Sequence, residues 1–183
     1  MADRIEGYRT PARLFHWATA ALVLLMIPAG LIMVQQGLDR SLQNALFIFH
    51  KNVGVLVLLL VLARLVYRLR VPPPPLPADM PAWQHRISGI THGLLYALLI
   101  AVPVAGYVRV RAGGFPIELL DALGIPALVP RSESLAELAK MLHWLGGLAL
   151  AALIAVHVAA ALFHVIVKRD GVFSRMWPLK SPN

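Results

Sequence analysis

Long apolar segments alternate with short polar or proline-rich stretches along most of the chain. Four such segments are predicted, at residues 12–36, 42–69, 87–108 and 135–168. Each is long enough for a helix to cross the roughly 30 Å hydrocarbon core of a bilayer. Because hydrocarbon offers the backbone no hydrogen-bond partner, helices are the expected structure. The pattern predicts an all-α integral membrane protein, a four-transmembrane-helix bundle that forms a single unit over residues 1–183.

Local signals predict where helices begin. Thr10 followed by Pro11 favours a start there, since proline at the first helical position loses no hydrogen bond. Ser134 with Glu137 has the capping-box pattern and predicts the start of the last helix.

The first apolar run is longer than a signal-peptide core, so we interpret it as a retained span. Between residues 109 and 131, glycine and proline alternate with apolar residues, which indicates a short helix on the membrane surface.

Composition supports the membrane assignment and narrows the chemistry. The chain is 58% hydrophobic and 14% charged, with a mean hydropathy of +0.70. It has no cysteine, which excludes covalent c-type haem, iron–sulfur clusters, thiolate zinc sites and disulfides. The net charge is +8, but the basic residues flank apolar segments instead of forming one polar face. We therefore expect membrane lipid as the surroundings and no nucleic-acid partner.

The basic residues also predict orientation. Lysine and arginine total 11 on the side that holds both termini and 6 on the other side. With acidic residues included, the net charges of the two sides are +7 and +1. The positive-inside rule then predicts that both termini are cytoplasmic.

Histidines recur in the spans at related depths. His143 and His157 lie 14 residues apart, which keeps them within about 40° of one helix face and about 21 Å apart along the axis. His50 and His143 each follow a serine near their helix start by nine residues, so both are predicted near the outer surface. His16 and His157 are predicted together toward the inner surface. Two imidazoles from facing helices are what a six-coordinate b-type haem needs.

Two further histidines carry open alternatives. His92 lies at about the depth predicted for the inner pair, where it could hydrogen-bond a haem propionate or a quinone, or replace His16 as a ligand. His164 lies seven residues beyond His157 on the same face, closer to the cytoplasmic surface. It is interpreted as a residue that supports a ligand or contacts quinone, with a structural role equally open.

Three basic residues are predicted near the outer pair: Lys51, Arg109 and Arg111. A lysine next to hydrocarbon must snorkel or find an anionic partner, and a haem propionate is suitable. Together these three cations would attract a small anion toward the outer surface. Interfacial anchoring is the alternative interpretation.

Five strings of the sequence share the positions of the histidines: RLFHW at 13–17, HKNVG at 50–54, HGLLYALLIAVPVAGY at 92–107, HWLG at 143–146 and HVAAALFHVIVKRDGVFSRMWP at 157–178. Together these strings resemble the bacterial cytochrome b561 family. That resemblance implies a four-helix bundle of the bacterial inner membrane with two non-covalent b haems. It implies axial iron ligands at His16, His50, His143 and His157. Members of the family exchange electrons with the quinone pool, and some oxidise superoxide and reduce ubiquinone.

We therefore predict an oxidoreductase that accepts electrons from superoxide at the outer side and reduces ubiquinone. A transporter with a histidine proton relay is disfavoured, because no Asp or Glu falls in the apolar core of any span. Two alternatives stay open: a quinol-fed electron carrier, and a haem-bearing membrane anchor that exchanges electrons with a partner redox protein.

Overall fold

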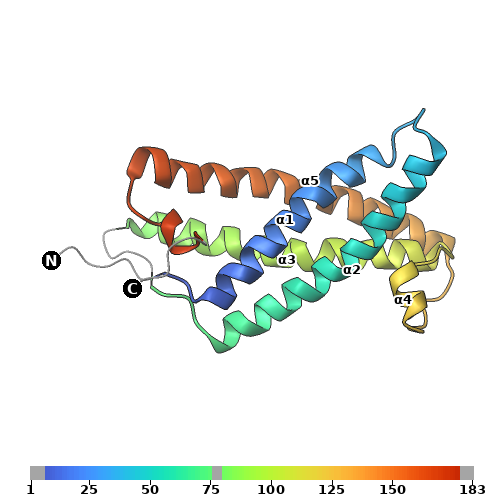
Figure 1. The fold of residues 1–183 in the computed structure, drawn as a ribbon, viewed down its shortest axis with the longest axis horizontal. Coiled ribbons are helices and arrows are strands. Elements are labelled where there is room, and N and C mark those ends of the chain that lie inside the picture. The colour runs from blue at the N-terminus through green and yellow to red at the C-terminus, as the bar shows by residue number, and fades with distance from the viewer. Residues whose placement is uncertain (1–6, 76–79, 178–183) are drawn as a thin grey trace.

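Four long helices run side by side in the computed structural model, which describes residues 7–75 and 80–177 (Figure 1). A short helix, α4, connects the third and fourth of them. The last long helix continues into a π-helical turn and is followed by a single 3-10 turn. The bounds are α1 Thr10–Ile32, α2 Arg40–Arg70, α3 Ala82–Ala112, α4 Glu118–Ala122, α5 Glu133–Phe163, the π turn His164–Lys168 and the 3-10 turn Phe173–Arg175.

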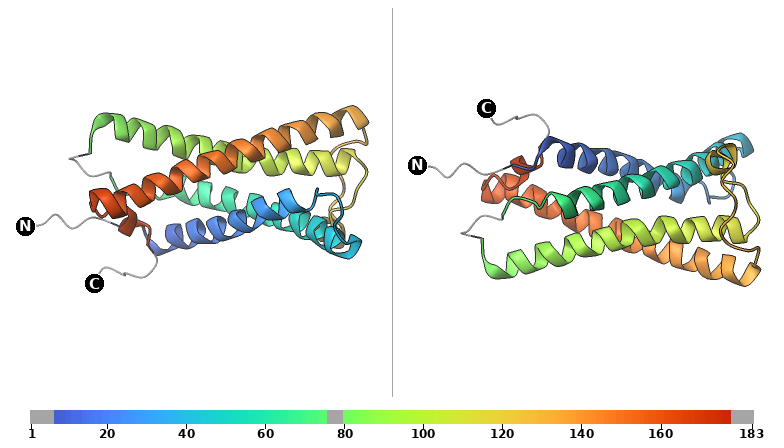
Figure 2. Two further views of the ribbon diagram at one scale, coloured as in Figure 1. Left: turned by 90° about the horizontal axis from the view of Figure 1, so that it is seen from above. Right: turned by 90° about the horizontal axis from the view of Figure 1, so that it is seen from below.

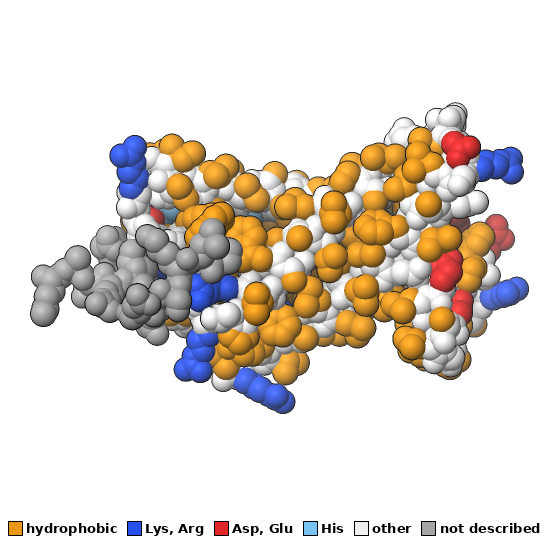
Figure 3. Space-filling model, in the orientation of Figure 1, with side chains coloured by type: hydrophobic (Ala, Val, Ile, Leu, Met, Phe, Trp, Pro, Cys, Tyr) orange, Lys and Arg blue, Asp and Glu red, His pale blue; other side chains and the backbone are white. Residues whose placement is uncertain are grey.

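The four long helices are each long and apolar enough to cross a membrane, with α5 and its π turn forming the last span. Hydrophobic side chains cover the middle of the bundle and charged side chains lie at its two ends (Figure 3). This confirms the predicted all-α bundle of four membrane helices. Some charges that enter the orientation prediction, within residues 1–6, 76–79 and 178–183, lie outside the described residues.

Several helix ends differ from the sequence prediction. α1 ends at Ile32, before the predicted end at residue 36, and α3 extends beyond its predicted span at both ends. The α3 extension includes the arginines in its last turn, because a helix continues through the polar interface, which a hydropathy pattern does not detect. The N-cap of α5 is Ser132, whose hydroxyl accepts a hydrogen bond from the Leu135 amide at 3.3 Å. The predicted capping box at Ser134 is therefore wrong.

The helices pack as neighbours, with α3 along α5 and α2 against both α1 and α3 (Figure 2). Small residues permit close approach: a Cβ at Gly146 of α5 would lie 2.9 Å from a methyl of Val102 in α3. An apolar cluster fills the middle of the bundle. Leu150, one of its members, lies seven residues from each of His143 and His157, so the cluster separates two groups of histidines. Its buried members are Val23, Val57, Val61, Leu95, Leu99 and Leu150.

The segment after α5 folds back onto the start of α1. The Trp17 indole donates to the Met176 carbonyl at 2.7 Å, and Arg13 donates to the Trp177 carbonyl at 3.2 Å. The Tyr8 amide donates to the Arg175 carbonyl at 3.0 Å. These bonds join the two ends of the described chain at one end of the bundle.

Candidate functional site

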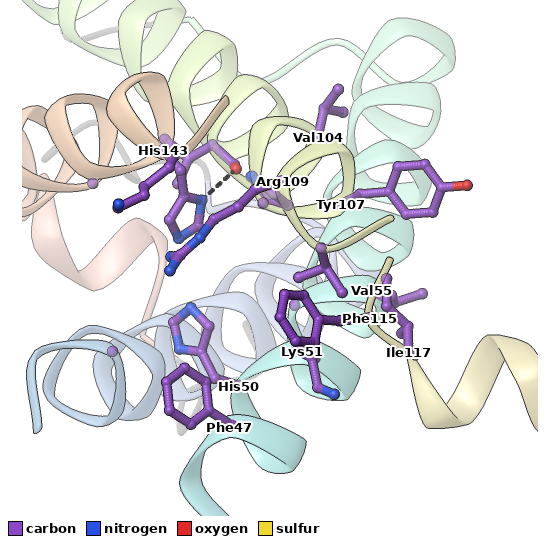
Figure 4. Close-up of a pocket in the computed structure, with 18 of the residues that line it drawn as sticks. Phe47, His50, Lys51, Val55, Val104, Tyr107, Arg109, Phe115, Ile117 and His143 are labelled. Atoms are coloured by element: carbon purple, nitrogen blue, oxygen red, sulfur yellow. Dashed lines mark hydrogen bonds between the residues drawn. The ribbon is translucent and has the colours of Figure 1, made fainter. Parts of the chain in front are cut away.

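His50 of α2 and His143 of α5 face each other at the end of the bundle that carries α4 (Figure 4). Their ring centroids lie 5.9 Å apart, and the ring planes are nearly perpendicular at 84°. Both rings are partly buried. The structure thus brings together the two residues that the sequence placed at equal depth.

The backbone fixes the orientation of one of these rings. His143 Nδ1 lies 2.9 Å from the Val102 carbonyl, so this nitrogen carries the proton and donates it. The other ring nitrogen is then free to bind a metal, an arrangement typical of metal-ligating histidines. His50 Nδ1 is buried and forms no hydrogen bond of ordinary geometry among the described residues, and the Met26 carbonyl of α1 is the backbone group that interacts with this ring.

Glycines let both rings lie against a neighbouring helix. A Cβ at Gly30 of α1 would lie 2.8 Å from His50 Cε1, and a Cβ at Gly106 of α3 would lie 3.0 Å from His143 Cε1. Two more glycines border the adjacent space. A Cβ at Gly147 would meet nothing within 4 Å, and one at Gly54 would meet only the Met26 methyl at 3.6 Å. These positions leave room for a flat ligand close to the backbone.

A cavity of about 1590 Å³ adjoins the histidine pair, lined mostly by apolar side chains from α1, α2, α3, α5 and the α4 region. The site fits a b-type haem. Two imidazoles that each bind one metal ion at about 2 Å would have ring centres about 6 Å apart, which is compatible with the observed separation. His50 and His143 would hold the iron, and the apolar walls and flanking glycines would accommodate the flat porphyrin.

The three basic residues predicted around this pair have different surroundings. Lys51 Nζ forms an ion pair with Glu118 at 2.6 Å and donates to the Pro116 carbonyl at 2.8 Å. Arg111 is buried and pairs with Asp121 at 2.6 Å. The expectation that both are free to attract an anion is therefore corrected, because α4 supplies each with a carboxylate.

Arg109 is the basic residue that points to the histidines. It lines the cavity, and its guanidinium is directed toward His50 and His143 (Figure 4). The guanidinium interacts electrostatically with both imidazoles. No ion pair of Arg109 is formed within the described part of the chain.

The α4 carboxylates respond to these cations. Burial opposes ionisation of Glu118, but hydrogen bonds from Lys51 and from the backbone outweigh it and lower the pKa of Glu118. The hydrogen bond from Arg111 lowers the pKa of Asp121. Asn52 adds to the attachment, since its side chain donates to Glu118 at 3.1 Å and accepts from the Leu119 amide at 2.9 Å. Ion pairs and hydrogen bonds thus attach α4 to the N-terminal half of α2.

Three histidines meet at the other end of the bundle. The His157 ring lies 6.3 Å from the His16 ring and 5.5 Å from the His92 ring, centroid to centroid. His92 Nδ1 lies 2.7 Å from the Ser88 carbonyl, to which it donates. Arg64 donates to His16 Nδ1 at 3.1 Å. The structure therefore groups His92 with the predicted pair and adds Arg64, which sequence spacing did not single out as a contact of His16.

His164 does not contact this group of rings in the structure. Its Nδ1 lies 2.5 Å from a carboxylate oxygen of Asp170, while the other oxygen accepts from the Val172 amide at 3.2 Å. The π turn and a left-handed residue, Arg169 at φ 53°, bring Asp170 back to the histidine. Sequence reasoning did not identify this partner, because an uninterrupted α-helix would have carried Asp170 away from His164.

Comparison with known proteins identifies the family of the chain. Residues 7–179 match the family model described as prokaryotic cytochrome b561. The chain is 30% identical over 172 residues to Cytochrome b561 homolog 2 of Escherichia coli (strain K12), covering 93% of this chain and 91% of that protein. It is 33% identical over 129 residues to Cytochrome b561 homolog 1 of the same organism, covering 70% and 73%.

A third relative has a name that states an activity. The chain is 28% identical over 169 residues to Probable superoxide oxidase CybB of Yersinia pestis, covering 90% of this chain and 92% of that protein. The family match extends over nearly the whole sequence and agrees with the four spans and the haem-compatible cavity. The chain therefore belongs to the prokaryotic cytochrome b561 family, multi-pass bacterial membrane proteins that carry b-type haem and transfer electrons.

Proposed function

We propose that this protein is a di-haem cytochrome of the bacterial inner membrane that transfers electrons from superoxide at the outer side to ubiquinone at the cytoplasmic side. The observation that carries the proposal is the presence of two groups of facing histidines, one at each end of the bundle, with an apolar cluster between them. The excess of basic residues at the end with the termini supports a cytoplasmic location for that end.

In this proposal His50 and His143 hold the outer haem and His16 and His157 hold the inner one. Bound haem supplies an iron that exchanges one electron at a time. The protein supplies the imidazole nitrogens and an apolar environment that excludes water. Val102 holds the His143 ring in the orientation that a ligand needs.

The choice of His16 over His92 follows the family resemblance, which implies His16 as the ligand. Two imidazoles that bind one metal ion through bonds of about 2 Å have ring centres about 6 Å apart. The His16–His157 separation of 6.3 Å and the His92–His157 separation of 5.5 Å are both close to this value. The present hydrogen bond from Arg64 would end when His16 binds metal through Nε2, because Nδ1 would then carry the proton. Arg64 would become available for an anionic haem propionate.

The overall reaction balances with two superoxide anions for each quinone. Each superoxide gives up one electron and becomes dioxygen. Ubiquinone takes up two electrons and two protons and becomes ubiquinol. The protein must therefore admit a small anion at one end and provide protons and quinone access at the other.

Arg109 is proposed to attract superoxide at the outer end. It is the cation that faces both outer histidines, while the α4 carboxylates neutralise Lys51 and Arg111. A positive charge in a cavity with apolar walls raises the association rate of a small anion. The name of the Yersinia pestis relative supports superoxide as the donor.

His164 and Asp170 are proposed to serve quinone at the inner end. Their hydrogen bond places a proton-carrying pair at the end of the last span, next to the π turn. A histidine bonded to a carboxylate can pass a proton to a reduced quinone oxygen and be reprotonated from the cytoplasm. Local π-helical turns occur often at functional sites.

Stopped-flow reduction of the purified oxidised protein by superoxide tests the proposal. We expect fast haem reduction that slows as ionic strength rises, and ubiquinol formation when quinone is present. A reduced-minus-oxidised spectrum of low-spin b-type haem, with two haems per chain by pyridine haemochrome assay, is expected in the same preparation. Slow reduction that does not depend on salt would instead indicate a quinol-fed carrier or an anchor for a partner redox protein.

A further inference from the structure

A separate pocket is lined by the start of α1 and the end of α2. These two helix ends lie at the end of the bundle opposite α4 (Figure 1). The volume of the pocket is about 330 Å³. Its walls come from the start of α1, the last turns of α2 and the proline run that follows. The side chains that matter below are Tyr8, Arg9, Tyr67 and Arg70, with Pro72 to Pro75 closing one wall.

A buried arginine shapes this wall. Arg175, only 3% exposed, donates to the Pro74 and Pro75 carbonyls at 2.7 and 2.8 Å. Its guanidinium also lies over the Tyr8 ring, 5.7 Å from the ring centre. The proline run is therefore fixed against the folded-back C-terminal segment, and the pocket is a defined feature of the fold.

The pocket has an excess of positive charge. Arg9 and Arg70 both line it and are exposed, and its described lining includes no Asp or Glu. The start of α1 adds to this, because Arg9 is the N-cap and provides no side-chain cap for the first-turn amides. The chemistry that suits such a pocket is a phosphate group, which two guanidinium groups bind well.

Exposed apolar side chains lie near the pocket in the sequence of both helices. Leu14 of α1 is 64% exposed and Leu69 of α2 is 75% exposed, each close in sequence to one of the pocket arginines. On membrane-spanning helices such surfaces contact acyl chains. Tyr8 and Tyr67 are residues typical of the headgroup level of a bilayer. The ligand that matches the whole surface is amphiphilic.

We propose that this pocket binds the phosphate of an anionic phospholipid headgroup between Arg9 and Arg70, with the acyl chains lying along Leu14 and Leu69. Basic pockets between membrane helices bind such headgroups in other proteins. A free phosphate would use the same two guanidinium groups but would leave the apolar surface without a partner. The proposal is independent of the haem ligands and of the electron donor.

Native mass spectrometry of the full-length, haem-loaded protein tests it, with phosphatidylglycerol titrated into neutral detergent. The Arg9→Gln/Arg70→Gln variant is expected to bind this lipid about tenfold more weakly than the unchanged protein. The matched control, Arg86→Gln/Lys168→Gln, removes two exposed charges at the same end but outside the pocket. It should weaken binding by less than about twofold. Arg9→Lys/Arg70→Lys should retain much of the binding, and the haem spectrum should be unchanged in every variant.

Three results would overturn the proposal. Equal losses in the pocket and control variants would show adsorption to surface charge. Equal affinity for phosphatidylcholine would show that the headgroup charge is not recognised. Complete displacement of phosphatidylglycerol by millimolar inorganic phosphate would assign the pocket to a free anion.

Discussion

The two ends of the bundle both bring histidines from different helices together, but they surround them differently. At the outer end His50 and His143 form an isolated pair beside a large apolar cavity. At the inner end three histidines share one region, and an arginine contacts one of them. Among the described residues, the end with α4 therefore brings together one pair of histidines, whereas the opposite end offers His157 two neighbouring histidines.

The charged side chains at the two ends also have different partners. At one end α4 provides carboxylates to Lys51 and Arg111, while Arg109 faces the cavity. At the other end Arg13 and Arg175 each donate to backbone carbonyls. The comparison teaches that two similar groups of histidines can be surrounded by differently partnered charges, because each end is completed by a different connecting segment.

The largest expected effect comes from removing ligands. His50→Ala and His143→Ala should each remove the outer haem and leave the inner one, because both are required for one bis-histidine site. His16→Ala and His157→Ala should remove the inner haem. Pyridine haemochrome assays should fall from two haems per chain to one in each variant, with a different spectral component lost at each end.

His92→Ala sharpens the comparison. If His92 only supports the inner site, the variant should retain two haems with a shifted spectrum. If His92→Ala loses the inner haem and His16→Ala retains it, the iron ligand is His92 and not His16.

Glycine substitution should affect the outer pair strongly. A Cβ at Gly106 would lie 3.0 Å from His143 Nδ1 and Cε1 and would disturb the bond to Val102. Gly106→Ala should therefore weaken outer haem binding by about tenfold or more, as loss of ligand-orienting contacts does at metal sites. Transfer of haem from the protein to apomyoglobin in a titration measures this change in haem affinity.

The control is Gly93→Ala in the same helix, where a Cβ would meet nothing within 4 Å. This variant should bind both haems normally. Equal loss in the two variants would attribute the effect to the helix and not to the ligand.

Substitution of Arg109 and of Arg111 should have different effects, the first on the rate of haem reduction and the second on stability. Arg109→Gln should lower the rate of haem reduction by superoxide about tenfold at low ionic strength and flatten its salt dependence. Arg111→Gln should change the rate much less, because Asp121 already neutralises this guanidinium, and should instead lower thermal stability. Stopped-flow rates at several salt concentrations distinguish them, and equal rate losses in both variants would contradict the role given to Arg109.

The smallest effect concerns pH. The folded-state pKa values of Glu118 and Asp121 lie below their ordinary values of 4.5 and 3.8. Because both carboxyl pKa values are lowered by folding, the stability that they contribute is fully present above pH 4.5. This contribution is lost as the pH falls through the pKa values of the folded protein. The melting temperature of the Glu118→Gln/Asp121→Asn variant should therefore be slightly lower than that of the unchanged protein at pH 6 and should converge with it in acid. A constant difference down to pH 3 would contradict this origin.

The sequence by itself determined the membrane class, the four spans and the relative depths of the histidines. These depend on local properties: apolar length sets a span, and 3.6 residues per turn sets where His143 and His157 lie on one helix. The lack of cysteine limited the soft metal ligands to histidine before any contact was known. Helix ends were less well predicted, since α3 continues through the polar interface that hydropathy excludes.

Only the tertiary structure decided which charges are paired and which groups share a site. Lys51 and Glu118 are 67 residues apart, and their contact depends on where α4 folds over α2. Asp170 reaches His164 because the π turn and a left-handed residue reverse the chain. Arg175 meets the proline run about 100 residues earlier through the folded-back C-terminal segment. Such contacts arise from packing between distant segments, which the periodicity within one segment does not encode.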